Sequence, residues 1–72
     1  MKMYYVTRFE QREDKPTEYY YGGGQWMTCK ASPEGWEGNE RIMLRLYKNE
    51  NLAKCVADEY TESDWHEIEI VD

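Results

Sequence analysis

The stretch Arg41–Val71, RIMLRLYKNENLAKCVADEYTESDWHEIEIV, decides the fold because its apolar period changes twice. Arg41–Tyr47 alternates apolar and polar or aromatic residues, which is typical of a strand. Lys48–Tyr60 has apolar residues at helical spacing, and Trp65–Val71 alternates again. A strand, a helix and a strand in this order predict a parallel crossover, which we expect to be right-handed.

The helix of this unit has clear signals at its start. Asn49 is a good N-cap, and Glu50 places an anion in the first turn, where the helix dipole favours it. We predict that the helix is amphipathic and that its buried face carries Leu52, Cys55, Val56 and Tyr60, with Ala53 and Ala57 beside them as small packing residues. In the last strand, we expect His66, Ile68 and Ile70 to meet this helix. Trp65, Glu67, Glu69 and Val71 then face away from it.

Outward from this unit, three more stretches favour β-structure. Met3–Phe9, Glu18–Tyr21 and Gln25–Lys30 are rich in aromatic and β-branched residues. The charged segment Glu10–Thr17 predicts an exposed hairpin connection, and Gly22–Gly24 predicts a bulge, bend or tight turn. We therefore expect one compact α+β domain over residues 1–72. It has a small mixed, mostly antiparallel sheet of about four strands, in the order β-β-β-α-β, with the helix packed on one face. The other face has no predicted cover.

The charge of the chain is concentrated in its C-terminal third. Asn49–Asp72 carries one lysine against eight acidic residues, a net charge of −7, whereas residues 1–48 sum to +1. A concentrated negative field repels nucleic acid and anionic membranes and attracts basic protein surfaces. A small nucleic-acid-binding sheet stays open only as an alternative in which the basic residues of the first 48 positions converge.

The bulk sequence indicates a cytoplasmic protein. Its N-terminal residues have no apolar core of a signal peptide, and no apolar run reaches the length of a membrane span. In the cytoplasm, Cys29 and Cys55 are expected to be reduced thiols rather than a disulfide.

Residue types that carry catalysis are sparse. His66 is the single histidine, and its place in the period of Ile68 and Ile70 indicates a structural role at the edge of the core. Any catalytic triad requires this residue. The two cysteines have no metal-binding spacing, and a domain of this size rarely forms the deep cleft that an acid/base pair needs. We expect no enzyme activity, no metal and no cofactor.

Four segments together resemble a known group of proteins. They are Tyr4–Val6 (YYV), Tyr19–Trp26 (YYYGGGQW), Arg45–Ala57 (RLYKNENLAKCVA) and Ile68–Val71 (IEIV). Their arrangement is similar to that of small accessory proteins of phages and prophages. This resemblance implies a compact α+β fold, an origin in a mobile element, a location in the host cytoplasm and a function in binding a host protein. It implies no catalytic residue.

Two functional hypotheses follow. The first is an inhibitory protein-binding module that engages a basic surface of a host protein. If the acidic surface imitates DNA, this host protein is one that handles nucleic acid. Its predicted contact residues are Asp58, Glu59, Glu62, Asp64, Glu67 and Glu69, with Trp36, Tyr47 and Trp65 as aromatic anchors. The second is a structural module that forms a homodimer through an uncovered aromatic sheet face, for which Tyr47 and Trp65 are candidates.

Overall fold

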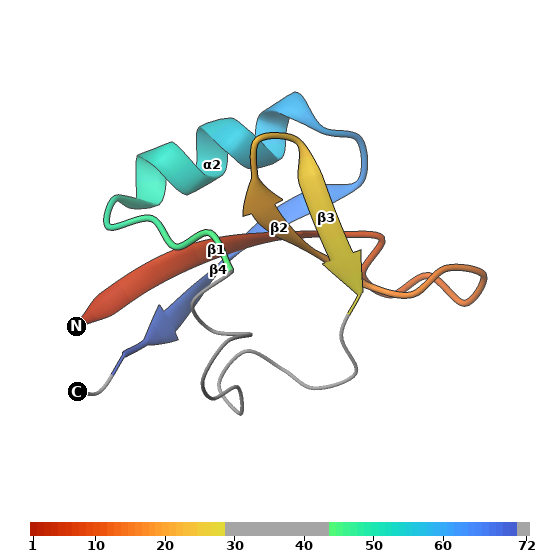
Figure 1. Cartoon of the computed structure of the whole chain (residues 1–72), viewed down its shortest axis with the longest axis horizontal. Coiled ribbons are helices and arrows are strands. Elements are labelled where there is room, and N and C mark those ends of the chain that lie inside the picture. The colour runs from red at the N-terminus through yellow and green to blue at the C-terminus, as the bar shows by residue number, and fades with distance from the viewer. Residues whose placement is uncertain (29–43, 71–72) are drawn as a thin grey trace.

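The computed structural model describes residues 1–28 and 44–70 of the chain. In these residues, a four-stranded sheet carries the helix α2 on one face (Figure 1). The elements are β1 (Lys2–Arg8), β2 (Glu18–Gly22), β3 (Gln25–Thr28), α2 (Glu50–Glu59) and β4 (Ser63–Glu69). The predicted α+β class and the order β-β-β-α-β are confirmed. The predictions made for Cys29, Trp36 and Val71 lie outside the described residues.

The first strand is at the centre of the sheet. The strand order is β3-β2-β1-β4, and every neighbouring pair is antiparallel. β1 pairs with β4 along its whole length, from Lys2 opposite Glu69 to Arg8 opposite Ser63. Its ladder with β2 is limited to the far end, near Thr7 and Arg8. Because β1 contacts the strands β2 and β4 as well as the helix α2, it organises the fold.

The strand predicted over residues 41–47 is wrong for the part that the structure describes. Residues 44–46 belong to no strand, and Tyr47 forms an isolated antiparallel bridge with Tyr4 through two backbone hydrogen bonds of 2.8 Å. The Arg45 N–H donates to the carbonyl of Tyr20 on β2 at 3.1 Å. This segment is thus hydrogen-bonded first to β2 and then to β1, so it forms no continuous ladder with either strand.

The helix begins where the sequence predicts, and Val56, Tyr60, Ala53 and Ala57 pack against the core as predicted, whereas Leu52 and Cys55 do not. The Asn49 side chain accepts a hydrogen bond from the Asn51 N–H at 2.7 Å, which confirms the N-cap. Ala53 and Ala57 are buried, whereas Leu52 is 56% exposed and Cys55 is also exposed. Placing Leu52 and Cys55 on the buried face was therefore wrong. No helix in the described ranges is long and apolar enough to cross a membrane.

Large side chains on the sheet explain why alanines form the buried face of α2. Val6 is fully buried beneath the helix, and Tyr20 and the half-buried Trp65 pack in the same cluster as Ala53 and Ala57. Small residues let the helix backbone approach such bulky neighbours closely. The helix thus covers the Trp65 side of β4. The prediction that His66, Ile68 and Ile70 meet the helix is wrong.

The opposite face of the sheet has a core of its own. Tyr5, Tyr19, Leu44 and Ile68 are buried together there, and Met3, Leu46 and Ile70 pack around them. The segment preceding α2 therefore contributes leucines to the face that was expected to have no cover. Tyr47 and Trp65, the predicted residues of an open aromatic face, pack instead in the cluster on the helix side.

The glycine run forms the tight turn between β2 and β3. Gly22, Gly23 and Gly24 have φ values of 94°, 60° and 77°, which side-chain-bearing residues rarely adopt. The turn folds Trp26 back against Tyr20, with ring centres 4.9 Å apart. Arg8 then lies 4.2 Å from the centre of the Trp26 ring.

Candidate functional site

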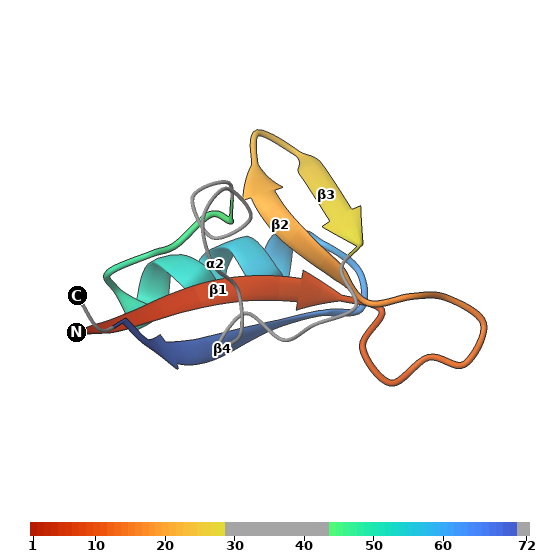
Figure 2. The same cartoon turned by 60° about the horizontal axis from the view of Figure 1, so that its bottom comes forward.

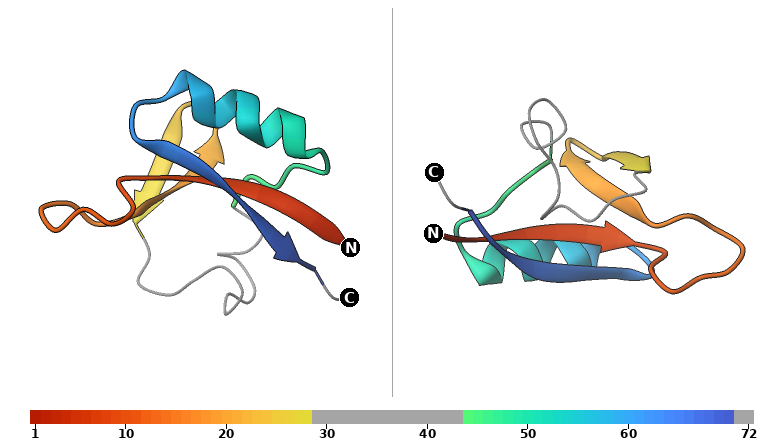
Figure 3. Two further views of the ribbon diagram at one scale, coloured as in Figure 1. Left: turned by 180° about the vertical axis from the view of Figure 1, so that it is seen from behind. Right: turned by 90° about the horizontal axis from the view of Figure 1, so that it is seen from below.

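A hollow of about 440 Å³ lies where the end of α2, the start of β4 and the β1–β2 loop meet. Two views show these segments gathered at one end of the sheet (Figures 1 and 3). The carboxylates on its lining are those of Glu10, Asp58, Glu62 and Asp64, and its cation is Arg12. Four carboxylates and one guanidinium give the lining a net charge of −3 at neutral pH.

The backbone brings these residues together through a short return after the helix. The Tyr60 N–H donates to the carbonyl of Ala57 at 3.3 Å and closes the last turn of α2. Glu62 then adopts a φ of 59°, and its carbonyl accepts a hydrogen bond from the Phe9 N–H at 3.1 Å. This bond extends the β1–β4 pairing by one step. It places the loop after β1 against the end of the helix.

The described residues other than glycine that have left-handed backbone conformations lie at this end of the molecule. Among the described residues other than glycine, Phe9, Gln11 and Glu62 have positive φ, at 61°, 68° and 59°. Such values are uncommon for residues of these types. Because strained residues persist only where their surroundings fix them, the turn and the loop support each other.

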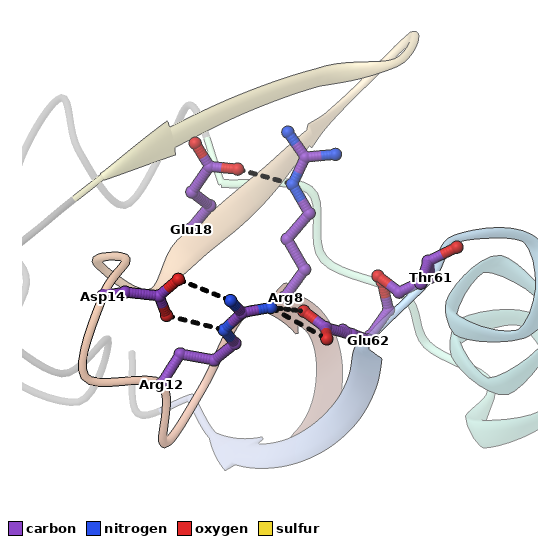
Figure 4. A network of polar contacts seen from close by, with 7 residues as sticks. Arg8, Arg12, Asp14, Glu18, Thr61 and Glu62 are labelled. Carbon is purple, nitrogen blue, oxygen red and sulfur yellow. Dashed lines mark hydrogen bonds and ion pairs between the residues drawn. The ribbon is translucent and has the colours of Figure 1, made fainter.

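Arg12 is held between two carboxylates (Figure 4). Its Nη1 donates to both oxygens of Glu62, at 2.9 and 2.8 Å, and its Nε donates to Asp14 at 2.8 Å. Hydrogen bonding to Arg12 lowers the pKa of Asp14, and hydrogen bonding to Asp14 and Glu62 raises the pKa of Arg12. Much of the negative charge of Glu62 is therefore balanced within the molecule.

Glu10 has different partners. Its carboxylate lies 3.0 Å from His66 Nε2 and accepts a hydrogen bond from the Thr7 hydroxyl at 3.3 Å. Thr7 is also 2.8 Å from the same His66 nitrogen, and Tyr5 stacks on the imidazole with ring centres 5.1 Å apart.

This threonine, histidine and glutamate do not form the arrangement of a catalytic triad. In a triad the nucleophile and the acidic group contact different nitrogens of the imidazole. Here both contact His66 Nε2, and Thr7 is 2% exposed. The geometry fits the predicted structural role of His66.

Asp58 and Asp64 are the least compensated acidic residues of the hollow. Among the described residues, no cation forms an ion pair with either of them. Asp58 also lies in the last turn of α2, which contains no basic residue. The partial negative charge at a helix C-terminus disfavours an acidic side chain there. These two carboxylates can therefore gain most from a cation supplied by another molecule.

The structure separates the predicted contact residues into distinct groups. Asp58, Glu62 and Asp64 line the hollow, and Glu59 is exposed on the same helix end without lining it. Glu67 and Glu69 lie farther along β4 and pair with Lys2 at 3.7 Å and with the Met1 ammonium at 2.8 Å. That hydrogen bond lowers the pKa of Glu69. Tyr47 and Trp65 are partly buried on the helix side.

Sequence reasoning missed Glu10 and Arg12 as residues of the site. Both lie in the charged loop after β1, 40 and 38 positions before Glu50, the first residue of α2. The only feature of the sequence that could have indicated these two residues is the high density of charge in that loop. Only the pairing of β1 with β4 shows that this loop lies against the helix end.

The described residues contain no group of three or more His, Cys, Asp or Glu side chains that could hold a metal ion. Comparisons with protein-family models, with curated proteins and with solved structures found no match to this chain. The chemistry of the hollow is therefore the basis for a functional proposal.

Proposed function

We propose that this chain is a non-enzymatic protein-binding module that receives a basic surface of a partner protein at the hollow. The observation that carries the proposal is the pair Asp58 and Asp64, which lie on the lining of the hollow without an ion-pair partner among the described residues. A lysine or arginine of the partner supplies the missing cation. Charge complementarity of this kind speeds association and makes it sensitive to salt.

The overall charge of the protein supports the same type of partner. The chain carries a net charge of −6, so a basic protein is attracted from a distance before any contact forms. The finer version of the proposal is that the partner is a host protein that handles nucleic acid and that the phage-type module inhibits it. In that version, the carboxylates of the hollow occupy sites where the partner binds phosphate.

The proposal is tested by two double variants that remove the same charge from different places. Asp58→Asn with Asp64→Asn removes two charges from the hollow, and Glu67→Gln with Glu69→Gln removes two from the part of β4 outside the hollow. Each protein is immobilised and used to capture partners from bacterial lysate at low and high salt, and its mass in solution is measured alongside. A nucleic-acid-handling protein as the captured partner would support the finer version.

We expect the hollow variant to lose its partner and the β4 variant, whose two carboxylates already pair with Lys2 and the Met1 ammonium, to bind it only slightly more weakly. Interfacial ion pairs contribute on the order of 1 kcal/mol each, so the hollow variant binds about ten to thirty times more weakly. Equal losses in both variants would mean that only the net charge matters and would contradict the proposal. Retention by both would contradict it as well. A stable homodimer without any partner would favour the structural alternative.

A further inference from the structure

Within the described residues, β4 is an edge strand of the sheet, and the outward backbone groups of an edge strand have no partner in the ladder. It is the last strand in the order β3-β2-β1-β4, and among the described residues it pairs with β1 only. Figure 2 shows β4 beside β1 on the side of the sheet away from β2. The ladder with β1 runs over seven residues without a register shift. The outward side of β4 is therefore an edge without a bulge, which can accept another strand.

The hydrogen-bond pattern shows which residues point to the free side. The Ile70 N–H donates to the Met1 carbonyl at 2.8 Å, and the Phe9 N–H donates to the Glu62 carbonyl at 3.1 Å. In an antiparallel pair, such bonded positions recur at every second residue. The even-numbered residues of β4 thus bond to β1. The N–H and C=O groups of Ser63, Trp65, Glu67 and Glu69 point outward.

β4 lacks several features that proteins use to protect an edge. It contains no proline, no lysine and no bulge, and its charged residues are Asp64, Glu67 and Glu69. Charges of one sign on an edge oppose pairing with a strand of the same sign. Pairing with a second copy of this chain, which carries a net charge of −6, is opposed in the same way. A basic strand meets no such penalty.

We infer that the outward edge of β4 binds an extended basic segment of the partner as an added strand. Main-chain hydrogen bonds to Trp65, Glu67 and Glu69 hold the segment, and its lysine or arginine side chains lie opposite Glu67 and Glu69. The inference takes the basic character of the partner from the proposed function. It also fits the site in space, because Ser63 and Asp64 belong both to β4 and to the lining of the hollow.

The probe for this inference is a short synthetic peptide that alternates lysine and threonine. Two control peptides accompany it: one alternates glutamate and threonine, and one carries N-methyl groups on alternate residues of the lysine peptide. N-methylation removes backbone donors from one edge of the peptide without changing its charge. The readout is the hydrogen-exchange rate of single backbone amides, followed by NMR.

The lysine peptide should slow exchange of the Trp65, Glu67 and Glu69 amides at least tenfold. The glutamate peptide and the N-methylated peptide should leave these rates unchanged.

Glu67→Pro removes one outward N–H and, because edge positions tolerate proline, keeps the ladder with β1. It should weaken binding of the lysine peptide about tenfold, since a strand-to-strand hydrogen bond is lost and the added strand is displaced. Glu67→Gln removes the charge and keeps the N–H, so it should weaken binding only about twofold.

Three outcomes would overturn the inference. One is binding of the lysine peptide without slower exchange of these amides. Another is equal binding of the N-methylated peptide. The third is slow exchange of the same amides without peptide in a sample whose mass is that of a dimer, because a second copy would then occupy the edge.

The variant Asp58→Asn with Asp64→Asn separates the two proposals. If its β4 amides are still protected by the lysine peptide while it captures the cellular partner as the unaltered protein does, the edge is confirmed and the proposed role of the hollow fails.

Discussion

The carboxylates at the end of α2 and the start of β4 differ from those near the end of β4 in what surrounds them. Asp58 and Asp64 line a hollow and have no ion-pair partner among the described residues. Glu67 and Glu69 lie across from β1 and pair with Lys2 and the Met1 ammonium. The excess of acidic residues in the sequence is thus divided into a compensated group and an uncompensated group. Only the uncompensated group, Asp58 and Asp64, can bind a cation of another molecule without competition from an ion-pair partner among the described residues.

The largest effect on this comparison should come from disrupting the helix that positions Asp58. Ala53 is fully buried against the sheet, so Ala53→Asp buries a charge without a partner. We expect it to lower the free energy of unfolding by several kcal/mol, or to prevent folding. Urea denaturation followed by circular dichroism measures this effect.

The adjacent residue provides the matched control. Leu52 is 56% exposed, so Leu52→Asp should change the free energy of unfolding by no more than about 0.5 kcal/mol. Equal destabilisation by both variants would show that the buried face of α2 is not the alanine face.

A smaller effect, of opposite sign for the two groups, should follow from neutralising one carboxylate of each. Asp58→Asn removes an unfavourable interaction with the C-terminus of α2 and should stabilise the protein by about 0.3–1 kcal/mol. Glu69→Gln removes an ion pair and should destabilise it slightly. Urea denaturation at low salt measures both, and the difference should shrink at high salt. Shifts in the same direction would show that the two groups share one electrostatic environment.

The smallest expected effect concerns single pKa values. Arg12→Gln should return the lowered pKa of Asp14 to its ordinary range and leave the lowered pKa of Glu69 unchanged, because the latter depends on the Met1 ammonium. A lowered carboxyl pKa in the folded state stabilises the protein above the ordinary pKa of about 4, and this contribution is lost as the pH falls through the folded value. The unaltered protein should therefore lose more stability than Arg12→Gln on acidification below about pH 4.

NMR titration of the side-chain carboxyl carbons measures these pKa values. A change in the pKa of Glu69 in the Arg12→Gln variant would indicate that the two ends of β4 are electrostatically coupled.

Local signals in the sequence predicted the local structure well. The N-cap at Asn49, the strand character of β1 and the tight turn at the glycines all depend on neighbouring residues, and each is confirmed. The buried face of α2 could not be chosen in this way. Leu52 and Cys55 fit the helical period as well as Ala53 and Ala57 do, and the choice depends on the bulk of Val6, Tyr20 and Trp65 across the interface.

The candidate site was likewise predictable only where its residues are close together in the sequence. The acidic density at Asp58, Glu62 and Asp64 is visible along the sequence, and these residues do lie together. That Glu67 is paired with Lys2, and that Glu10 and Arg12 complete the hollow, depends on the pairing of β1 with β4. These strands are separated by more than fifty residues, and alternation within each strand does not specify its partner.

The central position of β1 has a consequence for how the protein is made. Residues 2–8 leave the ribosome more than fifty residues before residues 63–69, the strand that pairs with them along their whole length. Contacts between residues so distant in sequence form slowly, because a long loop must close first. During synthesis, Tyr4, Tyr5 and Val6 therefore remain unpaired with β4 for some time. The nascent chain exposes the apolar side chains of this strand to the ribosome surface and to chaperones until residues 63–69 emerge.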